Sequence, residues 1–462
     1  MFLDDTIAAI ATPLGEGGLA VIRLSGVNAF AIADKCFSPI GKTSLKPSAA
    51  PTHTIHYGKV LRAEQVIDEV LLAVLRAPRT FTREDTVEIS CHGGLLPAKL
   101  VLDTLLASGA RMAEPGEFTK RAFLNGRIDL TQAEAVADLI HSRTELALAA
   151  ANEQLAGKLS QRINKLRDDL MLTMTHVEAH IDFPEEDISP DTKDKLLQRL
   201  DDGVKFMDEL LRSANEGQIL RRGIRAAIIG RPNAGKSSLL NQLLGHDRAI
   251  VSPIAGTTRD TIEETANIRG LPVIFIDTAG LREGQDEIEI EGIRSRESLA
   301  KAEFILHVLD ASEPLTEADK NYFTEFAGKK RIFVRNKMDL PVKLELPAAV
   351  AQTFQSALPI VDICCPSGQG IEALKDAIKE LVWSGEIKAE MLQVAINSRH
   401  QDALHRARAA AQLAVDAMRG AMTLELIAFD LRIAVNAVGE IVGKTTTEDL
   451  LDSIFSTFCL GK

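Results

Sequence analysis

The sequence predicts a multidomain α+β and α/β protein, in which an N-terminal α+β domain precedes a helical domain that an α/β domain interrupts. Up to about residue 125, short apolar runs of strand length mix with turns. Farther along, two stretches rich in Ala, Leu, Glu, Gln and Arg flank a block that alternates strand-like and helix-like segments. The predicted domains are 1–125 (α+β), 126–222 (helical, first part), 223–383 (inserted, with a mainly parallel sheet) and 384–462 (helical, second part).

The N-terminal domain is predicted from four segments. Leu19–Leu24 and Val70–Leu75 are apolar runs of strand length, and Thr86–Ser90 alternates as a half-buried strand does. Leu95–Ser108 then has the apolar spacing of an amphipathic helix. Strands and one helix of this size are typical of a modest α+β domain.

The helical domain is predicted from three long patterns. They run from about Leu130 to Ile181, from Thr192 to Leu220 and from Asn397 to Ile441, and Pro184 separates the first two because proline cannot continue a helix. Long helices of this kind are typical of a bundle. An insertion between its two parts is tolerated, since the ends of a domain usually lie close together.

Composition limits the partners and the location that we expect. The net charge of −12, from 53 basic and 65 acidic residues, argues against a broad basic RNA-binding surface, and one Trp with two Tyr argues against stacking platforms for bases. Five cysteines without a CxxC pair fit a reduced cytosolic protein. The chain begins without a basic signal-peptide stretch and has no apolar run of membrane-spanning length, so we expect a cytoplasmic protein without membrane contact.

A phosphate-binding motif opens the inserted domain. Residues 230–237 match GxxxxGK[ST], follow a strand-like segment at 225–229 and precede a helix-like one. Glycines let the backbone wrap around a phosphate, and the N–H groups of the helix start point at it. Lys236 is expected to reach the β- and γ-phosphates and Ser237 to bind Mg²⁺. A chance glycine-rich turn is the alternative reading.

Two companion motifs, each at the end of a strand-like segment, oppose that alternative. Asp277-Thr-Ala-Gly280 follows one strand, and Asn336-Lys-Met-Asp339 follows another. Together with the phosphate loop they resemble the Ras-like P-loop GTPase superfamily. In this resemblance the Asp339 carboxylate accepts hydrogen bonds from N1 and the 2-amino group of guanine, which selects GTP over ATP.

Two positions depart from the superfamily pattern. Cys364-Cys365-Pro366 stands where Ser-Ala-Lys is usual, which predicts modest guanine affinity, and Leu281 stands where Ras-type proteins carry the water-orienting Gln. A catalytic group must therefore come from elsewhere. The expected GTP-binding residues are Asn233, Ala234, Gly235, Lys236, Ser237, Ser238, Ser252, Pro253, Ile254, Ala255, Gly256, Thr257, Thr258, Asp277, Thr278, Ala279, Gly280, Asn336, Lys337, Met338, Asp339, Cys364, Cys365 and Pro366.

The whole chain resembles the MnmE (TrmE) family of tRNA-modification GTPases. The resemblance rests on motifs in all three parts, among them 23–26, 115–118, 121–125, 230–238, 254–260, 277–282 and the tail 458–462. It implies a homodimeric, potassium-activated GTPase. K⁺ would be held by Asn233, Ser252, Ile254 and Thr257, Mg²⁺ by Ser237 and Thr258, and the attacking water by Glu289. Arg259 is the rival charge stabiliser, although a lone Arg in a polar loop is usually solvated.

The same resemblance implies a one-carbon reaction, which composition alone does not reveal. Arg23, Glu88, Arg127 and Lys462 would bind 5,10-methylene- or formyl-tetrahydrofolate, whose carbon is added at C5 of the wobble uridine U34 of certain tRNAs. Judged without the family, Glu88 and Arg127 are more simply surface ion pairs. A flavoprotein partner, MnmG (GidA), would join in a heterotetramer. Cys459 is either a nucleophile or a residue with a non-covalent role near the same pocket.

Two other functions compete with this reading. A ribosome-assembly GTPase of the Era or EngA kind would carry an RNA-binding KH-like module, and no GXXG loop in a basic setting occurs in the sequence. A purely regulatory switch would use the N-terminal domain only for dimerisation. Folate binding to the N-terminal domain distinguishes the first reading from both.

Overall fold

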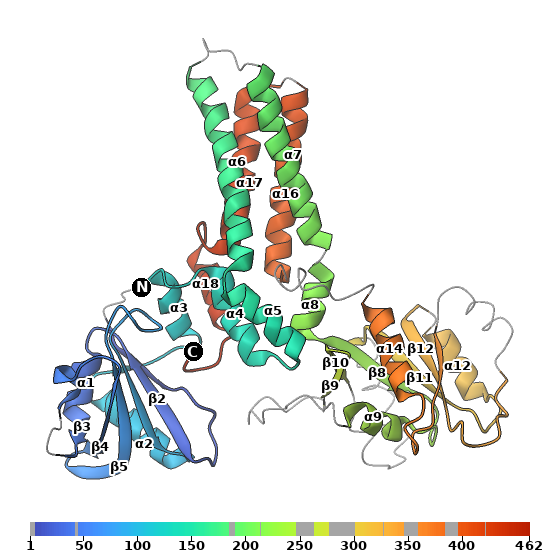
Figure 1. Cartoon of the computed structure of the whole chain (residues 1–462), viewed down its shortest axis with the longest axis horizontal. Coiled ribbons are helices and arrows are strands. Elements are labelled where there is room, and N and C mark those ends of the chain that lie inside the picture. Colours follow the sequence, from blue (N-terminus) through green and yellow to red (C-terminus); the bar gives the residue numbers. More distant parts are fainter. Residues whose placement is uncertain are drawn as a thin grey trace. The chain divides into compact units, whose positions relative to one another are not determined.

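The structure is a computed structural model that describes residues 5–41, 45–183, 190–212, 214–245, 263–276, 301–326, 328–345, 359–383, 396–420 and 422–462. The chain divides into two compact units (Figure 1). The first consists of Met1–Ala137, Leu155–Val204 and Ala403–Lys462, and the second of Asp138–Gln154 and Lys205–Asp402.

The first unit contains a seven-stranded sheet in the order β3-β4-β5-β6-β2-β1-β7, antiparallel except where β7 runs parallel to β1. The three strands predicted from the sequence are confirmed here as parts of β2, β5 and β6, which are longer than predicted by one, five and two residues. The strands are β1 (Ile7–Ile10), β2 (Leu19–Ser25), β3 (Phe37–Pro39), β4 (Thr54–Arg62), β5 (Gln65–Leu75), β6 (Thr86–His92) and β7 (Arg111–Met112).

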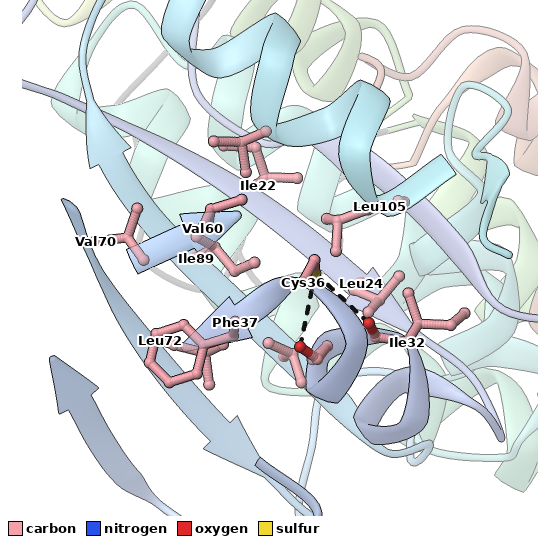
Figure 2. Packing of buried hydrophobic residues seen from close by; sticks show 14 of the residues in the cluster. Ile22, Leu24, Ile32, Cys36, Phe37, Val60, Val70, Leu72, Ile89 and Leu105 are labelled. Atoms are coloured by element: carbon pink, nitrogen blue, oxygen red, sulfur yellow. Dashed lines mark hydrogen bonds between the residues drawn. The ribbon is translucent and has the colours of Figure 1, made fainter. Parts of the chain in front are cut away.

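Two helices cover one face of this sheet. The apolar sides of α1 (Ala29–Cys36) and α2 (Leu95–Ala107) meet alternate strand residues in one core, in which Ile22, Leu72 and Leu105 are fully buried. Figure 2 shows strand and helix side chains of this core packed around Cys36, whose thiol lies near the carbonyls of its own helix. Burial raises the pKa of Cys36 to about 11, so this thiol is a neutral packing group.

A second, ionic cluster fixes the short helix α3 (Glu117–Leu124) to the sheet. Arg121 is 2% exposed and donates to Glu117 on its own helix, at 3.0 Å, and to Glu84, at 3.2 Å. Ser25 at the end of β2 donates to the same Glu84 at 2.8 Å. Buried charges of this kind are tolerated because each is paired and hydrogen-bonded. The cluster therefore holds α3 and the 80–86 loop beside β2.

The helical patterns of the sequence form more helices than were predicted. The run from Leu130 to Ile181 is broken twice: Thr144 Oγ1 accepts from the amide of Ala147 and caps a new helix, and Gly157 adopts a left-handed φ of 82° before the next one. The helices are α4 (Leu130–His141), α5 (Glu145–Leu155), α6 (Lys158–Asp182), α7 (Pro190–Arg212), α8 (Ala214–Arg222), α16 (Ser398–Arg419) and α17 (Leu424–Val442).

Four of these helices form a bundle, as predicted. In Figure 1, α6, α7, α16 and α17 run side by side, and α6 packs along the length of α17. Among the described residues, none of the helices combines the length and apolar character needed to cross a membrane.

The second unit contains a six-stranded sheet in the order β13-β12-β11-β8-β10-β9, in which only β9 is antiparallel to its neighbour. The predicted mainly parallel sheet is confirmed. The elements are β8 (Ile224–Ile229), α9 (Lys236–Leu244), β9 (Glu264–Ile268), β10 (Leu271–Phe275), β11 (Phe304–Asp310), α12 (Glu317–Glu325), β12 (Lys330–Asn336), β13 (Ile360–Asp362) and α14 (Ile371–Val382).

Helices cover both faces of this sheet. Successive side chains of a strand point to opposite faces, and in β11 both sets are mainly apolar and buried. Leu306 of β11 lies in the core that α9 and α14 share, whereas Leu309 packs with Phe323 of α12. His307 belongs to the α12 face. It is fully buried and its ring lies 5.2 Å from the ring centroids of both Phe323 and Phe333.

His307 makes the second unit sensitive to acid. Within the described residues neither ring nitrogen has a hydrogen-bond partner. Burial, with a smaller contribution from the charge of Arg331, lowers the pKa of His307 to about 4, although the charge of Asp319 opposes this shift. Because the folded pKa lies below the unfolded value of about 6.5, the unfolded state binds more protons between these two values. Stability is therefore retained above pH 6.5 and is lost as pH falls toward 4.

We predict that His307→Leu reduces this acid sensitivity. The variant lacks the titrating ring, so at pH 7 it should unfold at a temperature equal to or above that of the wild type. Between pH 6.5 and 4.5 it should escape a loss of up to about 3 kcal/mol. Calorimetry of both proteins at pH 7 and pH 5 measures the difference. An identical fall in melting temperature for both would contradict the assignment.

Candidate functional site

The predicted phosphate loop connects β8 to α9, as its motif requires. Lys236 is the first residue of α9, so the free amides of the helix start lie at the loop. Gly235 has a left-handed φ of 95°, and a Cβ on it would overlap the Asn336 side-chain amide. Only glycine fits there, because the loop approaches the Asn336 side chain so closely.

Two side chains of the phosphate loop have distinct environments. Lys236 Nζ donates to the carbonyls of Gly230 and Arg231, at 2.9 and 3.0 Å, and thus folds over the loop. Asn233 is exposed and adopts a left-handed φ of 63°, which Asn tolerates better than most residues. The loop therefore presents one cation and one exposed amide at the start of α9.

Asn336 ties the phosphate loop to the second predicted loop. Its Nδ2 donates to the Ala234 carbonyl at 2.9 Å, and its Oδ1 accepts from the Cys365 amide at 3.4 Å. The side chain is 2% exposed. The segments that contain Ala234, Asn336 and Cys365 are far apart in sequence. They meet at the carboxyl ends of β8 and β12. Ligands of parallel α/β sheets usually bind at these ends.

The Cys364–Pro366 segment completes this group in an unexpected way. The Cys364 thiol donates to Asp339 Oδ1 at 3.3 Å, so a sulfur donor stands where the superfamily usually has a Ser hydroxyl. A thiol is a weaker donor than a hydroxyl. Gln242 of α9 holds the Cys365 carbonyl at 2.7 Å. Burial raises the pKa of Cys365 to about 11, so this thiol is neutral.

The described residues contain only part of the predicted site. They include Asn233 to Ser238, Asn336 to Asp339 and Cys364 to Pro366, which the fold brings together. The predicted segments Ser252 to Thr258 and Asp277 to Gly280, together with Arg259, Leu281 and Glu289, lie outside the described residues.

A second polar cluster lies on the N-terminal sheet. Arg23 of β2 and Glu88 of β6 face each other in register, and Arg23 Nε donates to Glu88 Oε1 at 2.8 Å. The guanidinium also donates to the Gly461 carbonyl at 3.1 Å and lies 5.6 Å from the centroid of the Phe118 ring. The C-terminal tail therefore reaches the two sheet residues that were predicted with it.

The tail is attached through its backbone and through α18 (Glu448–Phe455). The rings of Phe455 and Phe458 pack in one cluster with Leu130, and the Lys462 carbonyl accepts from the Phe118 amide at 3.2 Å. Burial lowers the pKa of Lys462, the Arg23 charge adds to this, and Glu88 and Cys459 oppose it. Lys462 is thus within electrostatic range of the Arg23–Glu88 pair, and Cys459 is exposed.

Arg127 occupies a neighbouring position. It donates to the Thr80 carbonyl at 2.6 Å and lies 5.6 Å from the centroid of the Phe81 ring. Phe81 in turn packs against the small core that contains Phe118. Sequence reasoning missed both aromatic rings, although Phe118 lies inside a motif that it had singled out. Arg23 lies over the Phe118 ring and Arg127 over the Phe81 ring, and these contacts are visible only in the folded chain.

Comparisons with known proteins cover nearly the whole chain. A family model described as the MnmE helical domain matches residues 130–459, and one described as the GTP-binding protein TrmE N-terminus matches residues 6–127. The chain is 47% identical to the tRNA modification GTPase MnmE of Geobacillus kaustophilus and 48% identical to that of Geobacillus thermodenitrificans, with 99% of each chain covered. The solved G domain of the T. maritima FeoB iron transporter is similar over 34% of this chain and 98% of that one, at 25% identity and a TM-score of 0.26.

Proposed function

The chain belongs to the MnmE family of tRNA modification GTPases, and from this premise we propose that it hydrolyses GTP in the modification of tRNA. The observation that carries the proposal is the Asn336 side chain, which joins the phosphate loop to the loop beside Asp339. A nucleotide held there contacts both loops at once. The relationship extends over the full length, which favours this function over a ribosome-assembly GTPase of the Era or EngA kind.

Binding of GTP follows from the groups at the two loops. The amides at the start of α9 receive the phosphates, and Lys236 exchanges its two backbone carbonyls for phosphate oxygens. Ser237, in the first turn of the same helix, and Thr258 would hold Mg²⁺, which neutralises phosphate charge when bound. Asp339, oriented by the Cys364 thiol, accepts from the guanine edge.

Hydrolysis is proposed to depend on potassium. K⁺, when bound, would supply the positive charge that an arginine supplies in other GTPases. Asn233, Ser252, Ile254 and Thr257 would hold it, and the exposed left-handed position of Asn233 supports this role. Glu289 orients the attacking water.

The open face of the N-terminal sheet supports a homodimer. Ile55 is 69% exposed, and Tyr57 and Leu71, which pair across β4 and β5, are 48% and 46% exposed. Contiguous apolar residues on a sheet face are typical of an interaction surface. We place the dimer in the cytoplasm, with tRNA as its substrate and the flavoprotein MnmG as its partner in a heterotetramer.

The one-carbon unit is proposed to come from 5,10-methylene- or formyl-tetrahydrofolate bound at the N-terminal cluster. A pterin ring offers several N–H donors to a carboxylate, and a glutamyl tail offers carboxylates to cations. Glu88 is the carboxylate, and Arg23, Arg127 and Lys462 are the cations. The ion pair of Arg23 with Glu88 supports this, because it fixes the orientation of the Glu88 carboxylate before a ligand binds.

We predict that Glu88→Ala weakens binding of formyl-tetrahydrofolate at least tenfold, since charged hydrogen bonds contribute about 1.5–3 kcal/mol. Arg23→Ala should do the same, while GTP hydrolysis stays within about twofold of the wild type. Glu64→Ala, which removes an exposed carboxylate from the turn between β4 and β5, is the control. Titration calorimetry and phosphate release measure the two activities. Equal loss of both would indicate misfolding and would contradict a separate site.

A further inference from the structure

Lys337, the second residue of the predicted guanine motif, has a partner that the motif does not contain. Its ammonium forms an ion pair with Asp310 Oδ2 at 2.6 Å. The Lys337 backbone adopts a left-handed φ of 67°, which is unfavourable for a residue other than glycine by about 1 kcal/mol or more. A conformation of this kind persists only where the surroundings hold it in place.

Asp310 is itself held in one orientation. It is the last residue of β11, lies directly opposite Asn336 in the β11–β12 register, and is 4% exposed. Its Oδ1 accepts from both the amide and the hydroxyl of Ser312, at 2.9 and 2.6 Å, which leaves Oδ2 for Lys337. The Ala311 amide donates to the Asn336 carbonyl at 2.9 Å, so the segment is fixed to the motif.

The charge of this carboxylate is secure. Burial alone would raise the pKa of Asp310, but the hydrogen bonds from Lys337 and Ser312 outweigh burial and hold the pKa below its usual value. A buried carboxylate that accepts three hydrogen bonds is an anchor for a cation and has no proton to transfer at neutral pH.

We propose that Asp310 is a positioning residue for guanine-nucleotide binding, acting through Lys337. A free lysine has many rotamers, and ordering one on binding lowers affinity. The ion pair already orders the Lys337 side chain when the protein folds. Nucleotide binding therefore does not lose the conformational entropy of this side chain. This inference rests on the proposed GTPase function and names a residue outside the four positions of its guanine motif.

A double-mutant cycle tests the proposal, with the full-length protein and the fluorescent nucleotide N-methylanthraniloyl-GDP as the probe. Asp310→Asn should raise the Kd about tenfold and leave kcat at saturating GTP unchanged. Lys337→Met should raise the Kd at least as much, and the double variant should bind no more weakly than Lys337→Met alone. Ser312→Ala, which loosens Asp310 without removing its charge, should raise the Kd two- to threefold.

Asp362→Asn is the matched control. Asp362 accepts two hydrogen bonds of 2.6 Å from Arg335 of the neighbouring strand β12, and among the described residues its side chain has no hydrogen bond to the guanine motif. The Kd of the Asp362→Asn variant for the fluorescent nucleotide should equal that of the wild type. Melting temperatures identify any variant that loses affinity because it is unfolded. Wild-type affinity in both Asp310→Asn and Ser312→Ala, or additive effects in the double variant, would overturn the proposal. If the wild type itself does not bind the probe, the proposed function fails instead.

Discussion

Asp339→Asn is expected to lower the affinity for GTP by about a hundredfold and to raise the affinity for xanthosine triphosphate. The carboxylate accepts from N1 and from the 2-amino group of guanine, and two hydrogen bonds to a charged acceptor contribute about 1.5 kcal/mol each or more. An amide in its place offers a donor to the 2-oxo group of xanthine. Nucleotide competition against a fluorescent guanine analogue measures both affinities.

The Asp339 prediction separates base recognition from stability. The melting temperature of the variant should stay near that of the wild type, because within the described part of the chain the Asp339 side chain is held only by a weak hydrogen bond from the Cys364 thiol. Unchanged affinity for both nucleotides in a folded variant would show that another residue reads the base.

Asn233→Ala is expected to abolish the stimulation of hydrolysis by K⁺ while nucleotide binding is largely kept. The amides of the phosphate loop still hold the phosphates, but the exposed amide oxygen that we assign to the cation is gone. In the wild type, hydrolysis should be faster in K⁺ than in Na⁺, and NH₄⁺ and Rb⁺, which are close to K⁺ in size, should substitute. Loss of positioned charge of this kind is worth about 2–4 kcal/mol, roughly a hundredfold in rate.

Two further variants separate the cation from the water. Glu289→Ala should slow turnover by a similar factor while K⁺-dependent pairing of the nucleotide domains persists, since Glu289 is assigned to the water. Arg259→Ala should change the rate little. Steady-state rates in KCl and NaCl, with gel filtration for pairing, measure these outcomes. If the rate does not depend on K⁺ and falls strongly in Arg259→Ala, then Arg259 and not the cation stabilises the transition-state charge.

Local sequence patterns were sufficient to predict part of each sheet. Apolar runs directly before the phosphate loop and before the guanine motif predicted strands at 225–229 and 331–335, which the structure extends to Ile224–Ile229 and Lys330–Asn336. The parallel order of the second sheet also followed, since strand and helix patterns alternate along the chain. The two breaks at Thr144 and Gly157 were missed, because one side-chain cap and one left-handed glycine do not disturb an otherwise continuous helical pattern.

The sites predicted from the sequence did not include residues of other segments that orient the ligand-binding side chains. The Cys364 thiol was read as a loss, because its contact with Asp339 depends on the positions of two separate loops. Asp310 carried a visible signal, an acidic residue at the end of an apolar strand, but its pairing with Lys337 required the strand register. Local motifs therefore predicted the groups that would touch a ligand and left out those that orient them.

The measurement that tests the central claim most directly is a nucleoside analysis of tRNA from a strain that lacks this chain, complemented with the wild type or with Asp339→Asn. We predict that the C5-modified wobble uridine disappears on deletion, returns with the wild-type chain, and does not return with the variant. Unchanged modified uridine in the deletion strain would contradict a role in tRNA modification. Full restoration by Asp339→Asn would show that guanine-nucleotide recognition at Asp339 is not required for it.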